Sequence, residues 1–145
     1  MKTPARILVP VDGSVGSDKA VGMAVMLAQA VGAVLDILYV SYFDRATDDT
    51  AEQVSWLPDS VVGSSGRASK AILDHAASLV PPDLRVECHV VTGVPARKII
   101  AFAEEKGDAM IVVGGRGLGL MEGFLLGSVS QAVMENAKGT VVVVK

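Results

Sequence analysis

Long apolar runs alternate with helical patterns along the chain. Four runs are apolar at every position or nearly so, which is typical of strands in a parallel sheet that helices cover on both faces. These runs are Ile7–Val11, Val34–Val40, Ala109–Val113 and Thr140–Val144. A fifth segment, Leu84–Val91, alternates, with Cys88 on the expected inward face and His89 on the expected exposed face. This alternation predicts a half-exposed edge strand.

Apolar residues at helical spacing fill the intervals between these strands. The first pattern ends at Gly32 and the second before Pro81, while the third runs from Pro95 to Gly107 and the fourth ends at Lys138. Proline in the first turn of a helix and glycine just after its end are typical start and stop signals. The βαβαβαβαβ order predicts one α/β domain over all 145 residues, built as an open, doubly wound parallel sheet.

The segment from Ser41 to Arg67 fits this pattern poorly. It mixes acids, serines and glycines, has weak periodicity and is too long for a simple connection. Long loops in compact domains are commonly functional or flexible. Two interpretations stay open, a flexible lid or partner surface and a variable solvated insertion with a few packed anchors.

Composition and charge restrict the class of protein. Half of the residues are apolar and only 4% are aromatic, and the formal net charge is −3. This charge predicts no general attraction to nucleic acid or to an anionic membrane. The single cysteine, Cys88, excludes an internal disulfide and suits a reducing compartment. With no signal-like stretch and no run of about 18 apolar residues, we expect a cytoplasmic protein.

A glycine-rich loop joins the run Ala109–Val113 to the last helical pattern. It reads Gly114-Gly115-Arg116-Gly117, then nine residues, then Gly127-Ser128. A strand, a glycine loop and a helix start in that order make an anion site, because backbone N–H groups and the helix dipole favour negative charge. The loop lacks the lysine of a Walker A site and the G-x-G-x-x-G spacing of a dinucleotide site. It therefore predicts a phosphate compound bound in another way.

The spacing G-x-x-G-x9-G-S, between a strand and a helix that leads to a valine-rich last strand, resembles the universal stress protein family. Further stretches resemble that family in the same order along the chain: Ile7–Ser14, Gly93–Ala96 and Gly107–Ala109. The resemblance covers nearly the whole chain. It implies a five-stranded sheet in the order 3-2-1-4-5, with the layering of flavodoxin-like proteins and adenine nucleotide alpha hydrolases, and a homodimer. The complete glycine motif implies the ATP-binding branch.

With this strand order, the winding reverses between the first and fourth strands, and ligands bind beyond the carboxyl ends there. Asp12 suits the adenosine end, with capping of its own turn as the alternative. Val40 would touch the base or the sugar, unless it is plain core. The predicted nucleotide-binding residues are Pro10, Val11, Asp12, Val40, Val113, Gly114, Gly115, Arg116, Gly117, Gly127, Ser128, Val129 and Ser130.

The phosphate end of this prediction also has structural alternatives. Gly114 and Gly117 would bring the backbone to the ribose and phosphates, or would serve a turn that needs positive φ. Ser128 and Gln131 form a capping box that competes for the same amides, whereas Ser130 is harder to explain as a cap. Because Arg116 is the one cation within the loop, we expect Mg²⁺ or Mn²⁺ to arrive with the phosphates, with no protein metal cage.

These features predict a homodimeric, ATP-binding regulatory protein of the stress response, with ADP or AMP as alternative ligands. The valine-rich strand Val141–Val144 would be an exposed apolar edge, and pairing with a second copy would cover it. The regulatory protein partner is unknown. No catalytic residue is predicted, since no lysine or base serves the phosphates. A slow ATPase and a nucleotide-independent scaffold are the alternative functions.

Overall fold

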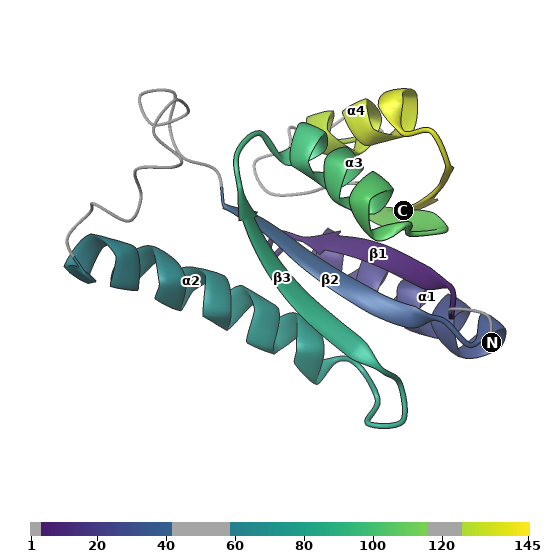
Figure 1. Cartoon of the computed structure of the whole chain (residues 1–145), viewed down its shortest axis with the longest axis horizontal. Helices are drawn as coiled ribbons and strands as arrows, with labels where there is room; N and C mark the ends of the chain where they lie inside the picture. The colour runs from purple at the N-terminus through teal and green to yellow at the C-terminus, as the bar shows by residue number, and fades with distance from the viewer. Residues whose placement is uncertain (1–3, 42–58, 116–125) are drawn as a thin grey trace.

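A parallel sheet forms the middle layer of the fold, with helices on both faces (Figure 1). The computed structural model describes residues 4–41, 59–115 and 126–145, and for residues 59–65 the backbone alone. The strands in these ranges are β1 (Arg6–Val11), β2 (Val34–Ser41), β3 (Val86–Thr92), β4 (Met110–Gly114) and β5 (Thr140–Val144). The helices are α1 (Val15–Val31), α2 (Asp59–Ser78), α3 (Pro95–Lys106) and α4 (Ser128–Asn136). The order β3-β2-β1-β4-β5 confirms the predicted doubly wound sheet.

The register of the strands brings the ends of β1 and β4 together. Leu8 pairs with Ile111 in parallel, so three residues further along, Val11 and Gly114 end their strands at the same edge of the sheet. On the other side of β1, Val11 pairs with Tyr39 of β2. The carboxyl ends of the three central strands therefore line one edge, where the winding of the sheet reverses.

Two apolar layers hold the helices to the sheet. Side chains of β1 and β2 such as Val9 and Ile37 pack with α1 and α2 through Ala24 and Leu73. On the opposite face, the β-strand side chains pack with α3 and α4, where Phe102 is a large buried contributor. Figure 1 shows the same division, with α3 and α4 over one face and α1 and α2 over the other. Residues of a parallel strand are thus buried on both faces, which explains the long apolar runs.

Helix α2 begins earlier than the sequence pattern predicts. It starts at Asp59, so residues 59–67 are helical although the sequence indicated an irregular segment up to Arg67. Two glycines and several serines in this stretch have weak helix propensity and hide the helical signal. At the other end of the predicted segment, Ser41 is the last residue of β2, and residues 42–58 lie outside the described residues. Among the helices described, none combines the length and the apolar character needed to cross a bilayer.

Strand β3 departs from the predicted inward and outward faces. Cys88 is exposed rather than a small core residue, and His89 is largely buried, with 19% of its side chain exposed. Because β3 lies at the edge of the sheet, Val86 still packs against the core while the same face is open at Cys88. His89 faces inward because it contacts a buried carboxylate, Asp36, across the sheet.

Candidate functional site

The turn after β1 is held by side-chain hydrogen bonds. The Ser14 N–H donates to Asp12 Oδ1 at 2.9 Å, and Gly13 has a φ of +85°, which favours glycine. Ser14 is the N-cap of α1, and its side chain accepts from the Ser17 N–H. Asp12 therefore has the turn-forming role that the sequence offered as its alternative, and a contact with a nucleotide stays a prediction.

The exit of β4 touches the first turn of α1. A Cβ on Gly114 would lie 2.5 Å from the carbonyl oxygen of Gly16 and 2.7 Å from its carbonyl carbon. Gly114 is absent from the glycines with positive φ in the described chain. The glycine is thus required by a close approach of two backbones rather than by a left-handed turn. Sequence analysis missed Gly16, although a glycine in a helix's first turn, where propensity disfavours it, is a usable signal.

Hydrogen bonds then bring the start of α4 beside this exit. The Gly115 N–H donates to the carbonyl of Val144, the last residue of β5, at 2.7 Å. The Gly127 N–H donates to the Gly115 carbonyl, also at 2.7 Å, and the Ser130 hydroxyl donates to the Gly114 carbonyl. The two parts of the glycine motif on either side of residues 116–125 are therefore in direct contact.

Helix α4 begins without a side-chain cap. Gly127 is the N-cap, with a φ of −71°, and no side chain bonds to the first-turn amides from this position. The predicted capping box is wrong, because Ser128 is already inside the helix and exposed. Ser130 is buried, and its hydroxyl bonds to β4 rather than facing outward. Amides of a first helical turn have no acceptor within the helix, so those of Ser128 and Val129 are suited to an anion.

The predicted residues fall into three groups in the structure. Val11, Val40 and Val113 are core residues with at most 9% exposure, and the latter two face α3 and α4. Pro10 and Asp12 are half-buried at the end of β1. The third group lies where β4 meets α4: Gly114, Gly115, Gly127, Ser128, Val129 and Ser130. Arg116 and Gly117 lie outside the described residues.

A charged cluster that the sequence did not predict lies toward the amino ends of the strands. Asp36 is 0% exposed, and Arg6 donates to both of its oxygens, at 2.8 Å from Nε and 2.6 Å from Nη2. Nη2 also lies 2.9 Å from Glu87, and His89 Nε2 lies 2.9 Å from Asp36. Burial raises the pKa of Asp36, but hydrogen bonds, chiefly from Arg6, outweigh it and leave the pKa lowered.

The same cluster brings potential metal-ligand atoms together. One such atom from each of Asp36, Glu87 and His89 lies within 4.8 Å of the others. The guanidinium of Arg6 already bonds to both carboxylates and supplies the positive charge there. The cluster is therefore a buried ion-pair network rather than a metal site. Its members come from three different strands, so no spacing in the sequence could have revealed it.

The family comparison agrees with this architecture. The model of the universal stress protein family matches residues 4–145, which spans both the β1 turn and the glycine motif. The chain belongs to the universal stress protein family. A curated relative, universal stress protein YxiE from Bacillus subtilis, is 32% identical over 145 residues, covering 97% of this chain and 98% of that protein.

Solved structures of universal stress proteins share the fold. Universal stress protein UspA from Lactobacillus plantarum has a TM-score of 0.72 and 26% identity, and the match covers both chains completely. A universal stress protein in complex with cAMP has a TM-score of 0.70 and 28% identity, with 99% of this chain and 98% of that chain covered. At least one relative with this fold thus carries an adenine nucleotide.

Proposed function

We propose that this universal stress protein binds ATP, with ADP or AMP as alternatives, where the carboxyl ends of β1 and β4 meet the start of α4. The observation that carries the proposal is the uncapped first turn of α4, beside two backbone contacts made by Gly114 and Gly115. Amides without an acceptor at a helix N-terminus are a ready site for phosphate oxygens. The cAMP complex of a relative supports an adenine nucleotide as the ligand.

The geometry suggests which end of the nucleotide lies where. The amides of Ser128 and Val129 at the start of α4 would hold the phosphates, with Mg²⁺ or Mn²⁺ bound to the phosphates themselves. Gly127, whose own N–H bonds to Gly115, would let the phosphates approach without meeting a side chain. Asp12 lies in the turn after β1, which leads into the first turn of α1 that touches Gly114, and would face the adenosine. We further propose that nucleotide occupancy controls binding to a regulatory protein partner in the cytoplasm.

A charge placed at Ser128 tests the phosphate end of this site. The side chain is exposed at the first residue of α4, so Ser128→Asp leaves the core intact. The new carboxylate stabilises the helix start by about 0.3–1 kcal/mol but repels phosphate. We expect wild-type protein to bind labelled ATP in equilibrium dialysis with Mg²⁺, and the variant to bind at least about tenfold more weakly, ~1.4 kcal/mol.

The neutral variant Ser128→Asn, similar in size to aspartate, is the matched control and should keep most of the affinity. Native mass spectrometry of the wild-type protein should show a co-purifying adenine nucleotide. Failure of wild-type protein to bind ATP at millimolar concentration would favour the nucleotide-independent scaffold. Phosphate release in single-turnover assays distinguishes a slow ATPase from a pure binding protein.

We also propose a homodimer formed through the outer edge of β5. In a parallel sheet, neighbouring residues of a strand point their backbone groups to opposite sides. Because the Val144 carbonyl faces β4, the N–H of Val143 faces the open edge. An apolar, unpaired edge is suited to pairing with a second copy of the same strand.

Val143→Pro should make the protein monomeric, since proline removes an N–H from the outer edge and is tolerated on edge strands. Val143→Thr keeps both the N–H and the branched shape, and should remain dimeric. Size-exclusion chromatography with light scattering measures the mass of each variant. A monomeric wild type, or a dimeric Val143→Pro variant, would show that β5 is not the interface.

A further inference from the structure

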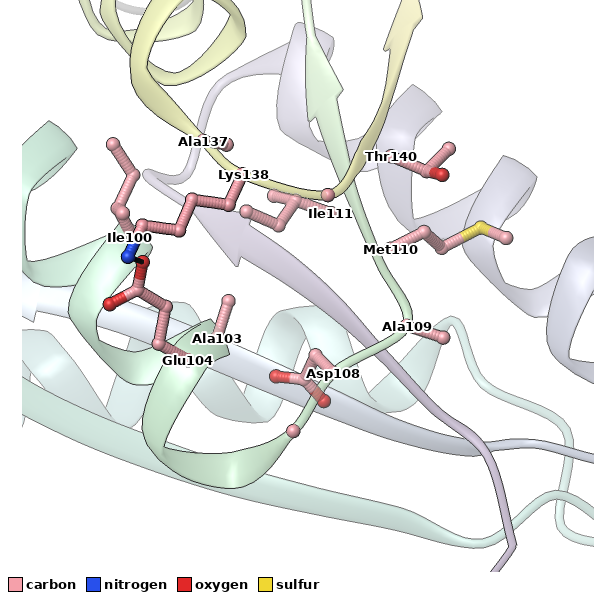
Figure 2. Close-up of a pocket in the computed structure, with 12 residues that line it drawn as sticks. Ile100, Ala103, Glu104, Asp108, Ala109, Met110, Ile111, Ala137, Lys138 and Thr140 are labelled. Carbon is pink, nitrogen blue, oxygen red and sulfur yellow. Dashed lines mark ion pairs between the residues drawn. The ribbon is translucent and has the colours of Figure 1, made fainter.

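A carboxylate without a hydrogen-bond donor lies at the end of the sheet opposite to the glycine motif. Asp108 stands between α3 and β4, and both of its carboxylate oxygens are buried with no hydrogen-bond partner among the described residues. It is one of the residues around a cavity of about 300 Å³ at the end of α3 and the starts of β4 and β5. Figure 2 shows its carboxylate directed away from Met110, the first residue of β4.

The neighbour of this carboxylate is the buried Asp36. The Ala109 N–H donates to the Arg6 carbonyl at 2.8 Å, so the adjacent Asp108 lies beside the residue whose side chain bonds to Asp36. Among the side chains, Asp36 also acts most strongly on the pKa of Asp108. Both oxygens of Asp36 already accept from Arg6, and one also contacts His89. Ionised carboxylates only accept hydrogen bonds, so two of them cannot bond to each other. A single proton between them turns this repulsive contact into a hydrogen bond and gives Asp108 the partner that it lacks.

We propose that Asp36 and Asp108 form a proton-binding site, in which Asp108 carries the proton and donates it to the ionised Asp36. The different surroundings of the two side chains explain why Asp108, and not Asp36, carries the proton. Arg6 bonds to Asp36 with two groups and keeps it charged, whereas the carboxylate of Asp108 has no cation bonded to it among the described residues. The oxygens of Asp108 are inaccessible to solvent, so a proton suits this position better than a larger cation.

Charged groups on β1, β3 and α3 act on this carboxyl pair. From β1, the positive charge of Arg6 is shared between Asp36 and Glu87 of β3. From α3, Lys106 favours ionisation of Asp108, and from β3, His89 bonds to Asp36. Burial, followed by the hydrogen bond and the charge of Asp36, outweighs Arg6 and Lys106 and raises the pKa of Asp108 to about 8.

The bound proton makes the stability of the fold depend on pH. An unfolded aspartate ionises near pH 3.9, whereas native Asp108 keeps its proton to about pH 8. Between these values the native state holds one more proton than the unfolded state. Stability from this site is therefore complete below about pH 4 and falls as pH rises to about 8, by up to about tenfold in the unfolding constant per pH unit.

Urea unfolding of the full chain between pH 5 and 9 tests the stability change. Asp108→Asn keeps the shape and supplies a permanent N–H donor to Asp36. We expect the wild-type unfolding constant to rise with pH up to about pH 8, and the variant to lose most of that rise. Asp83→Asn makes the same side-chain substitution at an exposed position between α2 and β3, and should follow the wild type. Equal slopes for all three proteins would overturn the proposal.

A direct readout does not require the variant to fold. In wild-type protein labelled with ¹³C at the aspartate carboxyl carbons, one carboxyl resonance should titrate near pH 8 in the native state. If Asp108→Asn folds, that titration should be missing from its spectra and present in those of Asp83→Asn. A wild-type protein in which every aspartate carboxyl titrates below about pH 6 would show that no shared proton exists.

Discussion

Replacing Arg6 with methionine is expected to lower the free energy of unfolding by about 3–5 kcal/mol, because it leaves the buried Asp36 carboxylate without its main partner. Arg6 supplies two short hydrogen bonds to a side chain that is 0% exposed, and water cannot replace them. Methionine keeps much of the apolar stem of arginine, so the fall in the free energy of unfolding comes mainly from the lost charge and hydrogen bonds rather than from lost packing. Urea unfolding at pH 7 measures the effect.

Arg85 provides a matched control on the same edge of the sheet. It pairs with Glu87 at 3.1 Å, but 70% of its side chain is exposed. Arg85→Met should therefore change stability by no more than about 1 kcal/mol. The double variant Arg6→Met/Asp36→Leu should recover much of the loss, because no ionised carboxylate then remains at the fully buried position and Glu87 keeps its pair with Arg85. A loss below about 1 kcal/mol for Arg6→Met alone would contradict a buried, structurally important ion pair.

Replacing Gly114 with alanine is expected to cost about 1–3 kcal/mol of stability, a range typical of overpacking. The added methyl group would lie 2.5 Å from a backbone oxygen of Gly16, and a backbone atom cannot swing aside as a flexible side chain can. Relief requires the start of α1 or the end of β4 to move. Because both border the proposed nucleotide site, weaker ATP binding should accompany the loss of stability.

Gly22→Ala is the control for this substitution. Gly22 lies within α1, and a Cβ there would meet nothing within 4 Å. Alanine in an open helical position is expected to stabilise the protein by about 0.5–1 kcal/mol. Unfolding curves and ATP dialysis of both variants test the pair. A Gly114→Ala variant as stable as the wild type would mean that the contact between α1 and β4 yields easily.

Patterns that depend on neighbours in sequence were predictable. Each strand expected from an apolar run is present, and Gly32 and Gly107 end α1 and α3 in the left-handed conformation typical of a helix C-terminus. The contact between the end of β4 and the start of α4 was also predictable, because the glycine motif that makes it lies within one short stretch of sequence. Helix α2 was only partly readable, since its first residues have weak propensity.

Features that depend on residues distant in sequence were not predictable. The His89 side chain faces the buried Asp36 and bonds to it. The two residues become neighbours only when β2 and β3 pair, so the sequence alone does not show this contact. The position of Ser130 is similar. Its hydroxyl donates to the Gly114 carbonyl of β4, a contact between two elements that the sequence did not indicate, and its contact with a ligand stays a prediction.

The bond from Gly115 to the last residue of β5, and the one from Gly127 back to Gly115, make a short relay between the outermost strand and the start of α4. A nucleotide bound at that helix start and a second subunit paired with that strand would therefore be connected through these two hydrogen bonds. If binding at the helix start changes the affinity between the subunits, thermodynamic linkage requires that subunit pairing change the binding affinity by the same factor. Any coupling between the proposed ATP site and the proposed dimer would therefore make the stability of that dimer depend on bound ATP.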